Sequence, residues 1–256
     1  MTRNAVRRPV RRMPAEKRIA DIMDAARAVF AERGASEALI SEIAERAGVV
    51  EGSIYRFFSN KRELVERVVE SWYEDMLAEH GAQFEGVRGA WNQLRVIVHH
   101  HLVTIKREPA LSRIVFQDLR PAPDYRATRV FQLNQTYTNR VVDVVRAGVA
   151  SGEFRRDVSA HLVRDMIFGC IEHRTWAFLR NEGDFDVAAT ADAIANLVYR
   201  AIAATPESPD DRAALALDRL ERATLRLEQL ANGSASAKSG GGKSGGRKRV
   251  TAKVRP

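Results

Sequence analysis

The side chains best suited to binding chemistry lie close together in one short stretch of this sequence. Ser53, Tyr55 and Arg56 can all donate hydrogen bonds, and Arg56 also carries a positive charge. Hydroxyl and guanidinium groups bind phosphate oxygens and the edges of base pairs. A helix here would turn these three side chains outward and turn Ile54 and Phe58 inward. The stretch therefore predicts a surface that binds nucleic acid.

Two short helices are predicted to position these side chains. The first carries Ile43, Ala44 and Ala47 on one face and ends at Gly48, which can adopt a positive φ. The second covers about residues 51–57. Two short helices that cross at a glycine turn form a helix-turn-helix, and the second helix of this motif fits the major groove of DNA. DNA binding is therefore the first functional hypothesis.

Length and composition are those of a globular protein. The chain has 256 residues, of which 45% are hydrophobic and 29% are charged, enough to bury a core in one or two domains. It has no apolar run of about 18 residues that could span a membrane, and no apolar segment of a secretory signal follows the basic N-terminus. The single cysteine, Cys170, cannot form an intrachain disulfide, which fits a cytoplasmic protein.

The formal net charge of +8 is concentrated at the two ends of the chain. Residues 1–18 carry seven basic residues and one acidic residue, and residues 232–256 carry seven basic residues and no acidic one. The remainder, residues 19–231, is therefore mildly acidic. In a DNA-binding protein, the two basic ends would provide the long-range attraction to phosphate. The body would determine the position of the protein along the DNA.

Helical periodicity continues through most of the chain, and the sequence shows no alternating strand pattern. One helix is predicted from Pro14 to Gly34, and another opens at Asn60, gains a capping box from Glu63, and runs to about Glu79. The fold class is therefore all-α, with a disordered basic arm at 1–13 and a disordered basic tail at 232–256. Further helices, separated by proline and glycine, are predicted at 90–107, 110–119, 124–150, 157–180, 187–204 and 211–231.

Residues 25–34 (AARAVFAERG), 43–49 (IAERAGV) and 52–64 (GSIYRFFSNKREL) together resemble the TetR family of bacterial transcriptional regulators. The resemblance covers about residues 18–76. It implies an N-terminal three-helix helix-turn-helix DNA-binding domain at 14–80 and a C-terminal helical ligand-binding and dimerisation bundle at 81–231. It also implies a homodimer, usually a repressor, that binds a palindromic operator in double-stranded DNA and is released by a small-molecule effector.

The resemblance also assigns DNA-binding roles to individual residues. Ser53 matches a position near the floor of the groove, and Tyr55 and Arg56 match positions that contact phosphate or base edges. Lys61 matches a lysine that meets phosphate at the start of a helix. Tyr55 could instead pack inside the protein, and Lys61 could be a solvated charge in the first helical turn.

The sequence departs from the family pattern at the starts of two helices. Leu39 and Ile40 open the second helix, where Thr or Ser is usual, so either Ser41 caps this helix or its end frays. Val50 stands where Ser or Thr usually caps the recognition helix. A lost cap costs about 1 kcal/mol. Glu51 replaces a common Lys or Arg. Glu51 could accept a hydrogen bond from a cytosine amine in the groove, or could only offset the missing cap through the helix dipole.

The two basic ends are candidates for phosphate contacts. Arginines of the N-terminal arm can lie in a narrow minor groove, and a plain solubilising arm is the alternative. The C-terminal tail could attract phosphate without sequence preference or could serve solubility alone. The arm residues assigned to DNA binding are Arg7, Arg8, Arg11 and Arg12.

The resemblance places the dimer interface on the helices at 157–180 and 187–204. Apolar stripes on both helices fit a buried seam, although they could also pack within one chain. The predicted interface residues are Leu162, Met166, Gly169, Cys170, Ile194, Leu197, Val198 and Ala201.

An effector cavity is expected among the helices that cover 90–180. Its candidates suit a mainly apolar ligand with a few polar atoms, although each of them could be plain core. Residues 171–179 look somewhat like members of the family that sense acyl-CoA or fatty acids. The predicted lining residues are Trp91, Val98, Leu102, Phe116, Phe131, Asn134, Tyr137, His173 and Trp176.

Nothing in the sequence indicates an enzyme, a cofactor or a metal site. A Gly-rich phosphate loop and a nucleophile arrangement are both lacking. The three histidines at 99–101 cannot converge on one ion, because successive helical residues turn by about 100°. The competing functional hypothesis is a basic-tailed protein that coats or shapes DNA without an effector.

Overall fold

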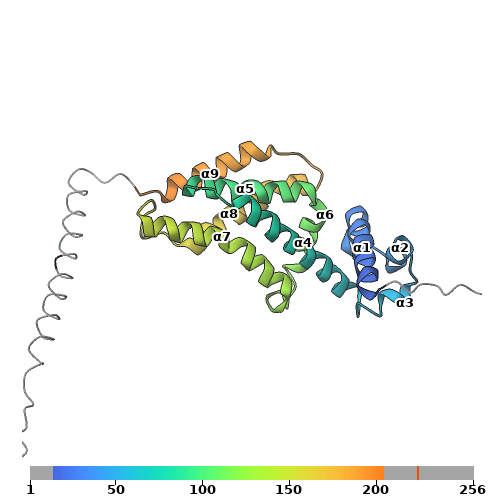
Figure 1. Cartoon of the computed structure of the whole chain (residues 1–256). Coiled ribbons are helices and arrows are strands. Elements are labelled where there is room, and N and C mark those ends of the chain that lie inside the picture. Colours follow the sequence, from blue (N-terminus) through green and yellow to red (C-terminus); the bar gives the residue numbers. More distant parts are fainter. Residues whose placement is uncertain (1–13, 205–223, 225–256) are drawn as a thin grey trace, which may run out of the picture. The chain divides into compact units, whose positions relative to one another are not determined.

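The computed structural model describes residues 14–204 and Thr224 (Figure 1). Residues 14–204 fall within one compact unit. The regular elements of the described residues are all helices, apart from one isolated bridge between Phe154 and Ala203, so the predicted all-α class is confirmed. None of the helices in these residues is both long enough and apolar enough to cross a membrane. The predicted arm at 1–13, helix at 211–231 and tail at 232–256 lie outside the described residues.

Three helices, α1 (Ala15–Glu37), α2 (Ile40–Arg46) and α3 (Glu51–Ile54), gather at one end of α4 (Lys61–Phe84) (Figure 1). Their core is formed by apolar side chains that repeat at helical spacing. Ile22 and Phe30 of α1, Ile43 of α2 and Ile54 of α3 are all buried in it. The predicted helix-turn-helix is therefore present, with α2 packed on α1 and α3 packed on α2.

Glycines set the turns of this region. Gly48 has φ 65° between α2 and α3, in the left-handed region that glycine reaches without strain. Gly34 has φ 79° and ψ 168°, which breaks the helical path where the first helix was predicted to stop. One more helical turn follows before Leu39. As predicted, neither Leu39 nor Val50 provides a side-chain cap for the helix that it precedes.

The start of α4 is well capped. The Glu63 backbone N–H donates to Asn60 Oδ1 at 2.9 Å, and the Ser59 N–H donates to Glu63 Oε2 at 2.7 Å. The predicted capping box is confirmed, with its return bond taken by Ser59 instead of Asn60. The helix runs past its predicted end near Glu79 to Phe84, because His80 is buried and its ring lies 5.6 Å from that of Phe84.

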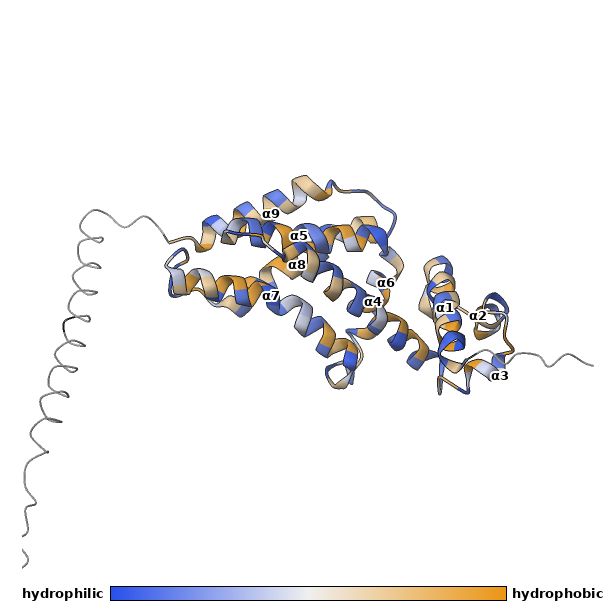
Figure 2. Cartoon of the chain, viewed as in Figure 1, coloured by the Kyte–Doolittle hydropathy of each residue, from blue (hydrophilic) through white to orange (hydrophobic). Residues whose placement is uncertain are grey.

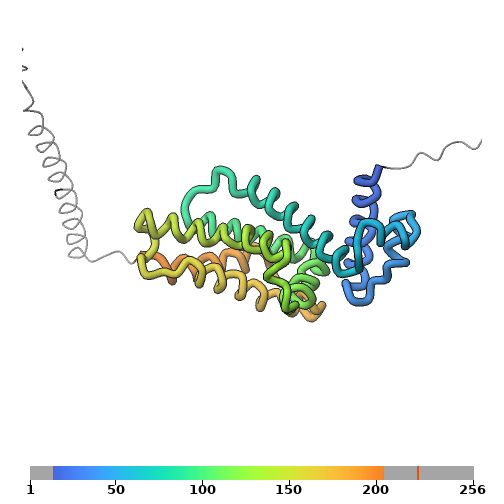
Figure 3. The backbone as a smooth tube through the Cα atoms, turned by 90° about the horizontal axis from the view of Figure 1, so that it is seen from below, coloured from blue at the N-terminus to red at the C-terminus, as the bar shows by residue number. Residues whose placement is uncertain are grey.

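The remaining described elements form a bundle that α4 joins by packing on α7 and α5 (Figures 1 and 3). Among them, α5 packs along α9 and α7 packs along α8. Figure 2 shows hydrophilic and hydrophobic residues mixed along these helices, as expected for helices with one buried face. The elements are α5 (Ala90–Arg107), α6 (Pro109–Arg113), the π-helix η1 (Ile114–Leu119), the 3-10 turn η2 (Tyr125–Ala127), α7 (Arg129–Ser151), α8 (Ala160–Leu179) and α9 (Val187–Ile202).

Two predicted helix starts are corrected by side-chain caps. The helix predicted to begin at residue 124 begins at Arg129, because Thr128 Oγ1 accepts the N–H of Phe131 at 3.2 Å. The helix predicted to begin at residue 157 begins at Ala160, where Ser159 provides the cap. The helix predicted at 110–119 is an α-helix only to Arg113 and continues as a π-helix.

The segment 109–119 connects the bundle to the helix-turn-helix. Leu111, Ile114, Val115 and Leu119 belong to the same hydrophobic cluster as the buried residues of α1 to α4. A second cluster lies within α5, α7, α8 and α9. A displacement of the π-helix would therefore disturb the packing under the helix-turn-helix.

Candidate functional site

The outward face of α3 is open to solvent. Ile54 and Phe58 are buried below it, whereas Glu51, Tyr55 and Arg56 are exposed. Among the described residues, Arg56 has no ion-pair partner. Ile54 and Phe58 therefore face inward as predicted. The side chains of Glu51, Tyr55 and Arg56 remain free to contact a binding partner. The α-helix itself is shorter than predicted, because it ends at Ile54 and gives way to a turn.

Ser53 and Lys61, the other predicted DNA contacts, each donate a hydrogen bond to a backbone carbonyl of the protein itself. Ser53 is half-buried, and its backbone N–H donates to the carbonyl of Val50 at 2.8 Å. The Lys61 ammonium group donates to the carbonyl of Ser36 at 2.6 Å. Lys61 thus fastens the first turn of α4 to the end of α1 while keeping two further N–H donors. The predicted contacts of Arg7, Arg8, Arg11 and Arg12 lie outside the described residues.

Arg62 ties α4 to the bundle. Its guanidinium donates to Asp124 Oδ1 at 2.6 Å and to Glu66 Oε1 at 2.8 Å. The hydrogen bond from Arg62 lowers the pKa of Asp124. A second ion pair, from Arg27 of α1 to Glu108 at 2.7 Å, joins the helix-turn-helix to the start of α6. The two pairs span the junction on either side of the segment 109–119.

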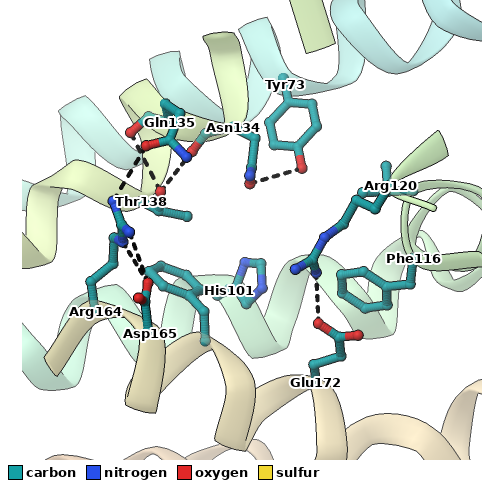
Figure 4. A pocket seen from close by; sticks show the side chains of 12 residues that line it. Tyr73, His101, Phe116, Arg120, Asn134, Gln135, Thr138, Arg164, Asp165 and Glu172 are labelled. Atoms are coloured by element: carbon teal, nitrogen blue, oxygen red, sulfur yellow. Dashed lines mark hydrogen bonds and ion pairs between the residues drawn. The ribbon is translucent and has the colours of Figure 1, made fainter. Parts of the chain in front are cut away.

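A cavity of about 130 Å³ lies inside the bundle (Figure 4). It holds the volume of roughly four waters, well below that of a typical ligand site. Most of its lining side chains are polar, which differs from the mainly apolar site that was expected. They come from α4, α5, the η1 region, α7 and α8, and are Tyr73, His101, Val115, Phe116, Arg120, Asn134, Gln135, Thr138, Arg164, Asp165, Phe168 and Glu172.

The charges of the cavity are balanced in pairs. Arg120 donates to Glu172 Oε2 at 2.6 Å, and Arg164 contacts Asp165 Oδ1 at 2.8 Å (Figure 4). Burial lowers the pKa of His101 to about 3, so that its imidazole is neutral. The lining therefore carries no net charge. A neutral polar group fits this arrangement better than a carboxylate, which would have to displace Glu172 or Asp165 from its arginine.

One of two amide side chains that line the cavity, that of Gln135, offers it a spare donor. Gln135 Oε1 accepts from Arg164 at 3.3 Å, and Asn134 Oδ1 is bonded to the Tyr73 hydroxyl at 3.3 Å (Figure 4). The oxygen of Gln135 is engaged and its NH₂ group has no partner among the described residues, whereas Asn134 also makes a side-chain hydrogen bond to Tyr125. The cavity is therefore suited to an acceptor oxygen, such as that of a carbonyl group.

Of the residues predicted to line an effector cavity, Phe116 and Asn134 line this one. The other predicted residues have different positions, because a buried stripe does not specify which neighbour a side chain meets. Val98, Leu102 and Tyr137 are fully buried in the hydrophobic clusters, and Phe131 packs edge-on against Tyr125. Trp91 donates to Asn196 at 2.9 Å, His173 is exposed, and Trp176 lies under Arg180.

The charged residues of the cavity were not among the predicted lining residues. Arg120, Arg164 and Glu172 resemble ordinary surface charges in the sequence, and only their partners across helices reveal them. Tyr73 was missed because it lies beside the apolar stripe of α4. An arginine close to an apolar stripe is the one sequence signal that could have indicated the charged residues of the cavity.

The outer faces of α8 and α9 expose apolar side chains. Leu162 is 59% exposed, Met166 53% and Leu197 72%. The small residues Gly169, Cys170 and Ala201, also predicted for the dimer interface, are exposed as well. Ile194 and Val198 are corrected, because they are buried in the core of their own chain. The remaining six residues form a surface that a second copy could cover.

Two family models match the chain. Residues 22–68 match the model described as bacterial regulatory proteins of the tetR family, and residues 88–202 match the tetracyclin repressor-like C-terminal domain. Together the matched segments include α2, α3 and the described bundle from α5 to α9.

Named relatives of this chain are transcriptional regulators. The fatty acid metabolism regulator protein of Bacillus subtilis is 24% identical over 71% of this chain and 93% of its own length. The probable HTH-type transcriptional regulator ArpR of Pseudomonas putida is 30% identical over 54% of this chain and 71% of its own length. The crystal structure of Bacillus subtilis FadR in complex with stearoyl-CoA is similar in fold, with a TM-score of 0.63, 24% identity, and coverage of 70% of this chain and 97% of that chain.

Proposed function

Because the chain belongs to the TetR family of bacterial regulatory proteins, we propose that it is a homodimeric repressor that leaves a palindromic operator when an effector enters its cavity. The observation that carries this proposal is the position of the π-helix. Val115 lines the cavity and also belongs to the hydrophobic cluster of the helix-turn-helix. An effector that displaces this residue would move the support of α1 and α4. The protein acts on double-stranded DNA in the bacterial cytoplasm.

Each part of the chain has its own task in this proposal. Residues 14–80 bind DNA, and residues 81–231 bind the effector and form the dimer. Arg56 and Tyr55 contact the operator from the exposed turn that follows α3, with Ser53 near the groove floor and Lys61 on phosphate. Glu51, which is exposed beside them, accepts a hydrogen bond from a base amine. Arg7, Arg8, Arg11 and Arg12 add phosphate contacts from the arm.

The dimer forms through the exposed faces of α8 and α9. Leu162, Met166 and Leu197 would be covered by the same residues of the second subunit, since a two-fold interface pairs one patch with itself. Gly169 is exposed on this face and has no side chain, which allows a second helix to approach closely. Two recognition helices then read two half-sites of the operator.

The effector is an acyl thioester, and acyl-CoA is the class proposed. The balanced charges of the cavity favour a neutral thioester group, and the spare NH₂ group of Gln135 suits its carbonyl oxygen. The similarity to a regulator solved with stearoyl-CoA supports the same class. The cavity is too small for a long acyl chain, so binding must widen it, which is the displacement that release requires.

Purified full-length protein is expected to select one palindromic sequence from random duplex oligonucleotides and to release it when stearoyl-CoA is added. Nuclease footprinting and fluorescence anisotropy would measure both steps, with coenzyme A alone as the control. Uniform coating of DNA without a protected site would favour the alternative, a DNA-coating or architectural protein without an effector. Sharp protection that stearoyl-CoA leaves unchanged would exclude acyl-CoA as the effector.

Gln135→Glu is expected to raise the stearoyl-CoA concentration needed for operator release by about tenfold. The substitution keeps the shape of the side chain but replaces its NH₂ donor with a second acceptor, and one lost hydrogen bond to a ligand costs about 1 kcal/mol or more. Titration of the preformed operator complex would measure the shift. Gln132→Glu makes the same change on the exposed side of α7 and should leave the midpoint where it is. Equal midpoints for both variants would contradict the assignment of Gln135.

A further inference from the structure

The residue before α3 is an unusual choice for its position. Val50 is the N-cap residue, and its side chain is 73% exposed. A serine or threonine here would accept a hydrogen bond from the helix and would expose less apolar surface. Valine therefore makes the protein without a partner less stable in two ways: it leaves the helix uncapped, and it exposes apolar surface to water. Glu51 in the first turn offsets part of the missing cap through the helix dipole, but no side chain of the described residues caps this helix.

Gly52, the second residue of α3, is also not required by the fold. A Cβ added to Gly52 would meet nothing within 4 Å, and its φ is not in the left-handed region. Alanine would fit there and would stabilise the helix. An exposed glycine in an ordinary helical conformation suits the close approach of something outside the chain. Val50 and Gly52 thus point independently to a partner that lies directly against the first turn of α3.

The chemistry of the major groove identifies what Val50 can meet. In a helix-turn-helix, the N-terminal residues of the second helix contact base edges. Among the groups on those edges, only the C5-methyl group of thymine is apolar. Glu51, Tyr55 and Arg56 offer hydrogen bonds or charge to the other groups, whereas the isopropyl group of Val50 can only form an apolar contact.

We propose that Val50 recognises the C5-methyl group of one thymine in each operator half-site, and that Gly52 permits this close approach. The inference rests on the proposed operator binding, and it identifies thymine as a base that the protein recognises in each half-site. Burial of a methyl group against the valine excludes water from both surfaces. The contact therefore discriminates thymine from cytosine, and also from uracil, which differs from thymine by this methyl group alone.

The test replaces each thymine of the selected operator, one at a time, by deoxyuridine. Base pairing is kept and one methyl group is lost. For the full-length protein, one symmetric pair of positions is expected to weaken binding by about fourfold for one half-site and about 15-fold for both. Val50→Ala should make these same positions insensitive, to within about twofold, because the partner of the methyl group is gone. Gly52→Ala should weaken binding while the melting temperature is unchanged or raised.

Leu39→Ala is the matched control, because Leu39 is a second exposed apolar residue at an N-cap, 58% exposed at the start of α2. The first helix of the motif crosses the DNA backbone, so this variant should keep the deoxyuridine pattern of the parent. The proposal is overturned if the operator contains no sensitive thymine, or if Val50→Ala keeps the sensitivity. Failure to select any operator would instead refute the proposed function itself.

Discussion

Arg56→Ala is expected to weaken operator binding by at least about 30-fold. A well-placed arginine contact to DNA contributes about 1–3 kcal/mol, and the dimer makes it twice, so the summed loss is about 2–6 kcal/mol. Arg56 is exposed and has no ion-pair partner among the described residues, so its truncation removes nothing that supports the fold. Fluorescence anisotropy with the selected operator, repeated at several salt concentrations, would measure the loss.

Arg180→Ala is the control for Arg56→Ala. It removes the same charge from the end of α8, where Arg180 pairs with Glu182 at 2.6 Å, and should leave operator affinity unchanged. The salt dependence separates two roles of Arg56, because each lost phosphate contact lowers the log–log slope by about 0.9, whereas a lost base contact changes base preference instead. An unchanged operator affinity after Arg56→Ala would show that α3 and the turn after it do not recognise the operator.

Leu197→Glu is expected to convert the dimer into a monomer, with the dimer dissociation constant raised by about 1,000-fold or more. Leu197 is 72% exposed on α9, so a glutamate is harmless to the isolated subunit. At a two-fold interface it would place two unpaired carboxylates in an apolar seam, which costs several kcal/mol. Analytical ultracentrifugation would measure the subunit equilibrium, and operator affinity should fall with it.

Leu39→Glu is the matched control for the dimer prediction. It introduces the same charge at a leucine that is 58% exposed but lies at the start of α2, far along the chain from α8 and α9. Its oligomeric state should equal that of the parent, and circular dichroism should show equal helix content for both variants. A Leu197→Glu protein that stays dimeric would place the interface on another face.

The helix-turn-helix could be predicted because its signals are local. Gly48 allows the turn, Asn60 and Glu63 cap the next helix, and the alternation of Ile54 with Tyr55 sets the two sides of α3. Each of these effects depends only on residues a few positions apart, so each can be recognised from the sequence alone. The predicted sides of α3 and the all-α fold class were accordingly confirmed.

The cavity could not be predicted, because it depends on which helices meet. Trp91 and His173 lie on helices that line the bundle, yet one bonds to Asn196 and the other faces solvent. Arg120 and Glu172 are 52 positions apart in the sequence and become partners only when the η1 region packs against α8. The same limit explains why Ile194 and Val198 were assigned to an interface: a buried stripe does not reveal whether its neighbour is the same chain or another.

The sequence by itself determined the family, the helical elements and the outward face of α3, since periodicity, turns and caps are properties of neighbouring residues. Tertiary structure alone decided which charges neutralise each other inside the bundle, which apolar residues stay exposed, and how Val115 connects the cavity to the helix-turn-helix. The physical reason is that burial and ion pairing depend on distances in space, and the packing of α4 to α9 sets those distances.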